Sequence, residues 1–464
     1  MKPTIGIEVH VELKNMAKVF SNSKNNFNDS PNTNINVIDL GYPGVLPCLN
    51  KGVIDYALKA CLAFNCKINQ IMHFDRKNYF YPDLPKGYQI TQKDTPIGYD
   101  GYVPINNKSI ILERIHIEED TCKLIHTKET LLNFNRAGVP LIEIVTTPCI
   151  SNGKEAMEYL EKLRETLLYL GVSDVKIEEG SMRCDVNVSV SNNEKLGTKC
   201  EVKNIGSISN VGIAIDYEIK RQTELLNNGE KIVEQTRRFD DKTKTTVLMR
   251  IKETGNDYRY FPEPDIPYIY ISDEWIKNVK DTIPVLTDEL KNKYEALGIN
   301  SNNIKTIIAN RDICNFLENV IEKCNPVIAA NLLTGDVLSY LNKNIIKIDD
   351  TKLNSKNFID LVNLLDEKKV SSKQAKEIMD VILENDENVS NIIKKNNMEQ
   401  INDDSIIINI VNRVIDNNLN SVNDYKDGKD RAIKYLMGQV MKESKGQINP
   451  QLANEILLKE LSKR

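Results

Sequence analysis

The stretch Thr4–Leu13 constrains the fold most strongly, because its apolar and polar residues alternate strictly. The odd positions are apolar, whereas Glu8, His10 and Glu12 occupy even positions. A period of two over this length indicates a β-strand with one buried face. Glu8 and His10 also supply oxygen and nitrogen ligands two residues apart on one face, so both can reach one metal ion. An edge strand with one wet face is the alternative explanation.

Length and composition indicate a soluble globular protein of two to four domains. The chain has 464 residues, of which 41% are hydrophobic and 27% charged, and it contains no apolar run long enough to span a membrane. Its net charge of −5 argues against coating nucleic acid by bulk charge, but leaves room for a local basic surface. The nine cysteines form no C-x-x-C pair, so we expect reduced thiols in a cytoplasmic protein.

The pattern changes near residue 288. Before it, strand-like segments with apolar and acidic faces alternate with helical ones, which predicts an antiparallel or mixed sheet with one face packed on helices. After it, aromatic residues become rare and short helical patterns alternate with polar breaks. We therefore expect an α+β protein with a catalytic domain at 1–287, a helical domain at 288–398 and a helical tail at 399–464.

Acidic residues recur on the predicted strands, and on one concave face they would repel each other unless cations lay among them. Their hard oxygen ligands favour Mg²⁺ over zinc. These acids are Glu119, Glu143, Asp185 and Glu201, beside Glu8 and His10. Basic residues that could hold anions nearby are Lys77, Lys86, Arg183, Lys199 and Lys203. Mg²⁺ with carboxylates and basic side chains suits ATP binding and phosphoryl transfer.

Two further segments carry information. Residues 74–92 combine five aromatic residues and two prolines with Lys and Arg, which predicts a rigid segment that presents its polar groups; a purely structural loop is the alternative. Residues 421–464 hold nine Lys or Arg against six Asp or Glu, which permits contact with phosphates or a solvated helix face. The chain has no Walker A, G-x-G-x-x-G, kinase or G-x-S-x-G pattern, so any ATP site is of an acidic-sheet type.

Several long strings resemble the B subunit of the aspartyl/glutamyl-tRNA amidotransferase, the GatB family. The resemblance runs through the whole chain to the tail. The strings are Ile5–Leu13, Phe74–Pro82, Phe134–Ile144, Gly180–Asp185, Tyr258–Asp265, Gly438–Lys442 and Lys445–Pro450.

The resemblance implies a cytoplasmic ligase of protein biosynthesis with a cradle-shaped catalytic domain. Using ATP and Mg²⁺, such a protein phosphorylates the side-chain carboxylate of Glu on misacylated tRNA-Gln, or of Asp on tRNA-Asn. An amidase A subunit makes ammonia from glutamine, and the ammonia passes through a channel to displace the phosphate. A small C subunit clamps the two, so we expect a heterotrimer. The chain itself lacks the Gly- and Ser-rich amidase stretch.

The resemblance also suggests roles for individual residues. The expected metal ligands are Glu8, His10, Glu119, Glu143 and Glu201, with Glu118 as an unranked neighbour. We expect Glu119, Asp185 and Arg183 to be catalytic, and Lys77 and Lys86 to lie at the channel. The expected tRNA-binding residues of the tail are Lys434, Gly438, Lys442 and Lys445.

The chain departs from the family at a zinc site that many members build from four cysteines. The matching positions are Ser21, Ser23, Asn36 and Asp39, so we expect no zinc and a loop held by packing. Two other functions stay open: a non-catalytic tRNA-docking and assembly subunit, and a metal-dependent hydrolase on the acidic face. The sequence leaves open whether the substrate is Glu-tRNA, Asp-tRNA or both, and where ATP binds.

Overall fold

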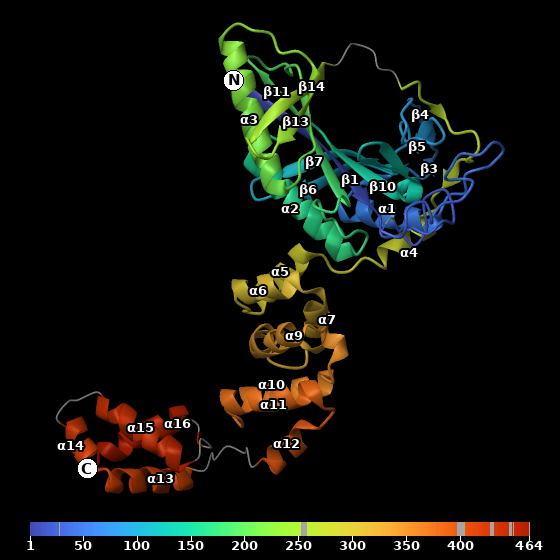
Figure 1. The fold of residues 1–464 in the computed structure, drawn as a ribbon. Coiled ribbons are helices and arrows are strands. Elements are labelled where there is room, and N and C mark those ends of the chain that lie inside the picture. The colour runs from blue at the N-terminus through green and yellow to red at the C-terminus, as the bar shows by residue number, and fades with distance from the viewer. Residues whose placement is uncertain are drawn as a thin grey trace. The chain divides into compact units, whose positions relative to one another are not determined.

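The computed structural model describes residues 1–26, 28–251, 258–396, 404–426, 431–444, 448 and 450–463. The chain divides into two compact units, Met1–Thr287 and Asp288–Arg464. The first unit combines sheets with helices, and the described part of the second is helical apart from turns and connections (Figure 1). The expected α+β class is confirmed, whereas the division into three domains stays a prediction.

A nine-stranded sheet organises the first unit. Its order is β14-β13-β12-β11-β1-β10-β7-β6-β2, and all neighbours are antiparallel except β12 and β13. The sheet is therefore mixed, as the sequence predicts. Its strands are β1 (Lys2–Glu12), β2 (Lys67–Ile68), β6 (Gly98–Pro104), β7 (Ser109–Glu119), β10 (Pro140–Thr146), β11 (Met182–Ser191), β12 (Cys200–Lys203), β13 (Gln235–Asp240) and β14 (Thr245–Ile251).

Strand β1 lies near the middle of this sheet, between β11 and β10. Ile5, Ile7, Val9 and Val11 are fully buried, which confirms the alternation read from the sequence. The alternative of an edge strand with one solvent-exposed face is wrong, because β1 is hydrogen-bonded to a neighbouring strand on each side. The polar residues of β1 therefore face a surface that several other strands also line.

Helices cover the apolar face of the sheet (Figure 1). Helix α1 contacts β7, α2 contacts β6, and α3 contacts β11, and their buried side chains join those of the strands in one core. The opposite face carries the even-numbered residues of β1. These helices are α1 (Lys51–Ala63), α2 (Gly153–Leu170) and α3 (Ile208–Asn227).

Three small sheets and two short helices complete the first unit. Strand β4 pairs with both β5 and β15, and Phe261 lies opposite Arg76, so the aromatic segment at 74–92 lies beside the string Tyr258–Asp265. The additional elements are β3 (Ile71–Met72), β4 (Asp75–Asn78), β5 (Tyr88–Thr91), β8 (Lys123–His126), β9 (Thr130–Asn133), β15 (Phe261–Pro262), β16 (Ile269–Tyr270), the 3₁₀ helix η1 (Phe134–Arg136) and α4 (Asp273–Lys280).

Of the four positions matched to the family's zinc cysteines, three surround the carboxylate of the fourth, Asp39. The hydroxyls of Ser21 and Ser23 donate to it at 2.7 and 2.6 Å, and the backbone N–H of Asn36 donates at 3.0 Å. The ammonium of Lys18, which is fully buried, lies 3.4 Å away. Hydrogen bonds and a buried ion pair thus hold this loop, where the sequence analysis expects packing. The absence of zinc stays an expectation.

The second unit is built from helices. Its last four, α13 to α16, share a core that includes Ile407, Val411, Leu436, Val440 and Leu457. No described helix of the whole chain is both long and apolar enough to cross a membrane. The helices are α5 (Thr287–Ala296), α6 (Ser301–Ala309), α7 (Arg311–Val320), α8 (Pro326–Leu332), the π-helix η2 (Leu333–Val337), α9 (Leu338–Asn344), η3 (Ile348–Asp350), α10 (Ser355–Asp366), α11 (Ser372–Glu384), α12 (Val389–Lys395), α13 (Asp404–Asn417), α14 (Leu419–Lys426), α15 (Arg431–Glu443) and α16 (Pro450–Leu461).

Candidate active site

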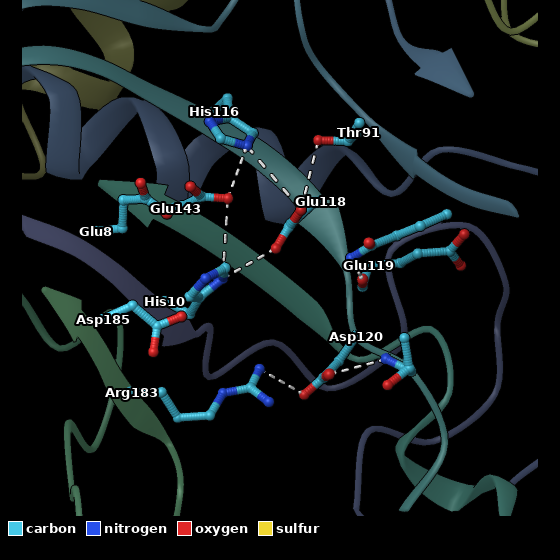
Figure 2. Close-up of polar contacts among 12 residues, drawn as sticks. Glu8, His10, Thr91, His116, Glu118, Glu119, Asp120, Glu143, Arg183 and Asp185 are labelled. Atoms are coloured by element: carbon cyan, nitrogen blue, oxygen red, sulfur yellow. Dashed lines mark hydrogen bonds and ion pairs between the residues drawn. The ribbon is translucent and has the colours of Figure 1, made fainter. Parts of the chain in front are cut away.

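Strand register places four charged or titratable residues in one row across the open face of the large sheet. His116 of β7 lies opposite Glu143 of β10, Glu143 lies opposite His10 of β1, and His10 lies opposite Arg183 of β11. Directly opposed residues of antiparallel strands bring their side chains together on one face. Figure 2 shows these side chains on the same surface, with Glu118 beside the row.

The closest contacts in this row join two histidines to two carboxylates (Figure 2). The His10 Nδ1 atom lies 3.0 Å from Glu118 Oε1 and 4.0 Å from Glu143 Oε2. The His116 Nε2 atom lies 3.2 Å from the same Glu143 oxygen. Ligand atoms of His10, Glu118 and Glu143 all lie within 4.8 Å of one another. We refer to His10, Glu118 and Glu143 as the carboxylate–histidine group.

The charges of this group stabilise one another. Burial alone would lower the pKa of His10, but the Glu143 carboxylate and the hydrogen bond to Glu118 raise it to about 9. Burial opposes ionisation of Glu143 and Glu118, yet the neighbouring histidines hold the pKa of both below the ordinary value. Burial and the charges of nearby acids raise the pKa of Glu8. With His10 protonated and both glutamates ionised, the His10 imidazolium lies between the carboxylates of Glu118 and Glu143.

The chemistry of the group fits a small divalent cation. Two carboxylates and one imidazole suit Mg²⁺ or Mn²⁺ better than a thiolate-binding metal. A cation here would replace the proton on His10, because a ligating imidazole must be neutral. His116 is positioned to orient Glu143 from behind, and its buried Nδ1 atom has no hydrogen-bond partner among the described residues. The candidate metal ligands therefore come from three neighbouring strands, β1, β10 and β7.

A lysine occupies the other half of the acidic face. The Lys203 ammonium lies 2.7 Å from Asp185 and 3.1 Å from Glu201. Glu201 also accepts a hydrogen bond from the Thr236 hydroxyl. Glu8 accepts one from the side chain of Asn187. The expected ligands Glu8 and Glu201 thus share the cavity with the carboxylate–histidine group, but the structure places them closer to Lys203 and Asn187 than to His10.

Glu119 leaves β7 on the opposite side from Glu118. Both of its carboxylate oxygens bind the Lys86 ammonium, at 2.5 and 2.6 Å, and one also accepts the backbone N–H of Ile90. Adjacent residues of a strand point to opposite faces, so Glu118 and Glu119 cannot both face the row. The structure therefore puts Glu118, rather than the expected Glu119, in the candidate metal group, and it pairs Glu119 with the expected channel residue Lys86.

The acidic face forms the floor of a cavity of about 900 Å³. The small β15-β4-β5 sheet contributes a second wall that includes Lys77, Thr91 and Tyr258. Arg183 lines the cavity too, and its guanidinium donates to Asp120 at 2.9 Å (Figure 2). The structure thus brings together most of the expected residues of the first unit, namely Glu8, His10, Lys77, Glu143, Arg183, Asp185 and Glu201.

The expected tRNA-binding residues lie in the second unit. Lys434, Gly438 and Lys442 are all exposed on α15. Residues four apart occupy one face of a helix, so these three form a continuous row. Lys445 lies outside the described residues.

His116, which belongs to the row, is not among the residues expected from the sequence. Glu118, which lies beside the row, is expected only as an unranked neighbour of Glu119. The alternation of β7 contained the signal: Ile115 and Ile117 are apolar and buried, so His116 and Glu118 must share the polar face. The pattern of β1 had already shown which face carries the acids.

The fold and the site define a protein of two units, an α+β unit with a polar, metal-compatible cavity and a helical unit. Residues 3–277 match the family model described as the GatB/GatE catalytic domain, and residues 315–461 match the GatB domain. The chain belongs to the family of B subunits of the tRNA-dependent amidotransferases.

Curated relatives extend this match to the full chain. The chain is 48% identical over 469 aligned positions to the B subunit of the aspartyl/glutamyl-tRNA(Asn/Gln) amidotransferase of Staphylococcus aureus strain JH9, with 99% of each chain covered. The same values hold for the corresponding protein of strain Newman. The expected resemblance is confirmed, and the names of these relatives, as B subunits, indicate that they act within multi-subunit complexes.

Proposed function

We propose that this chain activates and amidates the side-chain carboxylate of Glu on misacylated tRNA-Gln, or of Asp on misacylated tRNA-Asn, in the cytoplasm. ATP supplies the phosphoryl group, and the amide nitrogen is ammonia released from glutamine by a partner A subunit. A small C subunit completes the heterotrimer. The family membership supports the reaction class, and the cavity supports the assignment of the chemistry to this chain.

The carboxylate–histidine group carries the proposal. His10, Glu118 and Glu143 would hold Mg²⁺, with His116 fixing the orientation of Glu143. When bound, Mg²⁺ supplies charge stabilisation for the phosphoryl oxygens during transfer. Arg183 and Asp185 border the same cavity, where the Arg183 guanidinium can bind the aminoacyl carboxylate. Sheet register holds all these side chains, so the site needs little reorganisation.

The ammonia route belongs to the same proposal. Lys86 lies behind the floor of the cavity, paired with Glu119, and Lys77 lines the cavity itself. We assign both lysines to the path by which ammonia reaches the activated carboxylate. A sheltered path matters, because an acyl phosphate open to water would hydrolyse. The isolated chain should show no glutaminase activity, since it lacks the expected amidase stretch.

A neighbouring pair of variants tests the metal assignment. In the assembled complex, Glu118→Gln should weaken Mn²⁺ binding on the order of 100-fold and abolish transfer of labelled phosphate from ATP to Glu-tRNA. Glu119→Gln is the matched control, because its side chain lies on the opposite face and should leave Mn²⁺ affinity near that of the wild type. Equal Mn²⁺ affinities in the two variants would refute the assignment.

The same assay separates the alternatives. A tRNA-docking subunit would bind Glu-tRNA without transferring label to it, and a metal-dependent hydrolase would need no ATP. Phosphate transfer that depends on Glu118 excludes both.

A further inference from the structure

The cations that line the cavity differ in their partners. Arg183 donates to Asp120, Arg114 is paired with Glu113, and Lys203 lies between two carboxylates; these pairs lower the charge available to a ligand. Lys77 and Lys93 also line the cavity, and neither ammonium group has a carboxylate partner within the part of the chain that the structure describes. Their ammonium groups are held in a different way. The carboxylate partners of Arg183, Arg114 and Lys203 are Asp120, Glu113, and the pair Asp185 and Glu201, respectively.

Tyrosine rings hold both ammonium groups. The Lys77 Nζ atom lies 5.0 Å from the ring centre of Tyr258 and 5.9 Å from that of Tyr79. The Lys93 Nζ atom lies 4.7 Å from the ring centre of Tyr260. A ring face attracts a cation through its quadrupole at such distances but adds no negative charge. Both lysines are thus positioned and remain free to pair with an anion.

The backbone fixes this arrangement. Lys77 is part of β4, and Tyr258 and Tyr260 immediately precede β15, which pairs with β4. Asn78 binds the tyrosine segment twice, through its backbone N–H to the Tyr258 carbonyl at 2.9 Å and through its side chain to the Arg259 carbonyl at 2.8 Å. Arg259 adopts a φ of +46°, in the left-handed region that non-glycine residues rarely occupy. The two rings are therefore presented by an ordered segment.

Lys77 lines the same cavity as the carboxylate–histidine group. Burial alone would lower the pKa of Lys77, but the negative charges of Glu118 and Glu143 raise it above its ordinary value. A metal ion and an ammonium group in one cavity can both stabilise a transferred phosphoryl group, because charge spreads over its oxygens. The whole cavity, at about 900 Å³, has room for a nucleotide.

We propose that Lys77 and Lys93, each held on a tyrosine ring, form a phosphate-binding edge of the cavity. The inference rests on the proposed function, because it takes the phosphate to come from a substrate of that reaction. The shared chemistry is a phosphate ester, which both the polyphosphate of ATP and the phosphodiesters of the tRNA acceptor end provide. Lys77 lines the same cavity as Glu118 and Glu143, the candidate metal ligands, and this shared cavity favours the polyphosphate.

The test measures equilibrium binding to the assembled complex with Mg²⁺ present. The probes are a non-hydrolysable ATP analogue, inorganic tripolyphosphate and Glu-tRNA, each titrated separately. Lys77→Met and Lys93→Met should each weaken analogue and tripolyphosphate binding by about 10- to 100-fold, the loss expected for one charged hydrogen bond. Lys77→Arg keeps the charge and should retain most of the affinity. Tyr260→Leu should resemble Lys93→Met, whereas Tyr260→Phe should not.

Lys51→Met is the matched control. The Lys51 ammonium lies 5.0 Å from the ring centre of Trp275, the same distance as for Lys77 and Tyr258, but outside this cavity. Lys51→Met should leave the affinities for the ATP analogue, tripolyphosphate and Glu-tRNA unchanged. Loss of Glu-tRNA affinity alone in Lys77→Met and Lys93→Met would assign the edge to the acceptor end instead of ATP. Wild-type affinity of both variants for every probe would overturn the inference.

The proposed function and the phosphate-binding edge can fail separately. If the wild-type complex binds no nucleotide and transfers no phosphate, the proposed function is refuted, and the Glu-tRNA titration still decides whether the lysines bind phosphate. If the wild type binds and transfers normally and the lysine variants do the same, only the phosphate-binding edge is refuted.

Discussion

Removing the carboxylate of Asp39 should destabilise the first unit strongly. Asp39→Ala deletes the acceptor for Ser21, Ser23 and the Asn36 backbone, and it leaves the ammonium of Lys18 without its carboxylate. The exposed fractions of the Lys18 and Asp39 side chains are 0% and 3%, so water cannot replace the lost partner. Breaking a buried ion pair on one side costs about 3–5 kcal/mol. The hydroxyl hydrogen bonds are part of this loss and are not added to it.

Tryptophan fluorescence can measure the effect, because Trp275 is the only tryptophan of the chain and lies in the first unit. Its indole N–H donates to Asp55 at 2.6 Å, so its emission reports unfolding of this unit. A loss of about 3–5 kcal/mol should lower the midpoint of thermal unfolding on the order of 10 °C. Adding Lys18→Met to Asp39→Ala should recover much of the loss, since the uncompensated charge is then gone.

Asp29 provides the control within the same loop. It forms an ion pair of 2.8 Å with Lys24, but the exposed fractions of the two side chains are 37% and 60%. Exposed ion pairs contribute little, so Asp29→Ala should shift the midpoint far less than Asp39→Ala. Equal shifts would refute the reasoning, as would a failure of Lys18→Met to restore the Asp39→Ala protein.

Three more predictions concern pH, tRNA and ammonia. Burial alone would raise the pKa of Glu218, but hydrogen bonds such as that from Arg221 lower it. The ionised Glu218 carboxylate therefore stabilises the folded state above about pH 4.5, and this stabilisation is lost as the pH falls through the folded-state pKa. The destabilisation by Glu218→Gln, measured by denaturant titration, should shrink in acid. Lys434→Met combined with Lys442→Met should weaken tRNA binding by about tenfold and reduce its salt dependence, with ATP affinity unchanged. Lys86→Met should impair amidation with glutamine more than amidation with free ammonium; equal losses would remove this lysine from the ammonia route.

The strands of the large sheet and the polar side of each strand follow from local sequence. Alternation within β1 is a property of adjacent residues, so it identifies the buried and polar faces without knowledge of the neighbouring strands. The same rule, applied to β7, would have chosen Glu118 over Glu119, and would have added His116. The helical character of the second unit is equally local, because each helix there carries its own apolar stripe.

Contacts between distant segments could not be read in this way. Strand β15 pairs with β4 although their sequences lie more than 180 residues apart, and nothing in either segment specifies that pairing. The register of β10 against β7, which places Glu143 opposite His116, is likewise set by the whole sheet. The sequence therefore predicts which residues are polar and ordered, whereas their partners depend on tertiary structure.

The lysines of the first unit show why the partner matters more than the residue type. Lys18 is fully buried against Asp39 and contributes to stability. Lys203 separates two carboxylates that would otherwise repel each other. Lys77 rests on tyrosine rings, so its charge stays available. All three are alike in composition and in net charge, and only the groups around each ammonium separate a structural ion pair from a binding site. A substitution that gave Lys77 a carboxylate partner should therefore reduce phosphate binding as effectively as removal of the lysine itself.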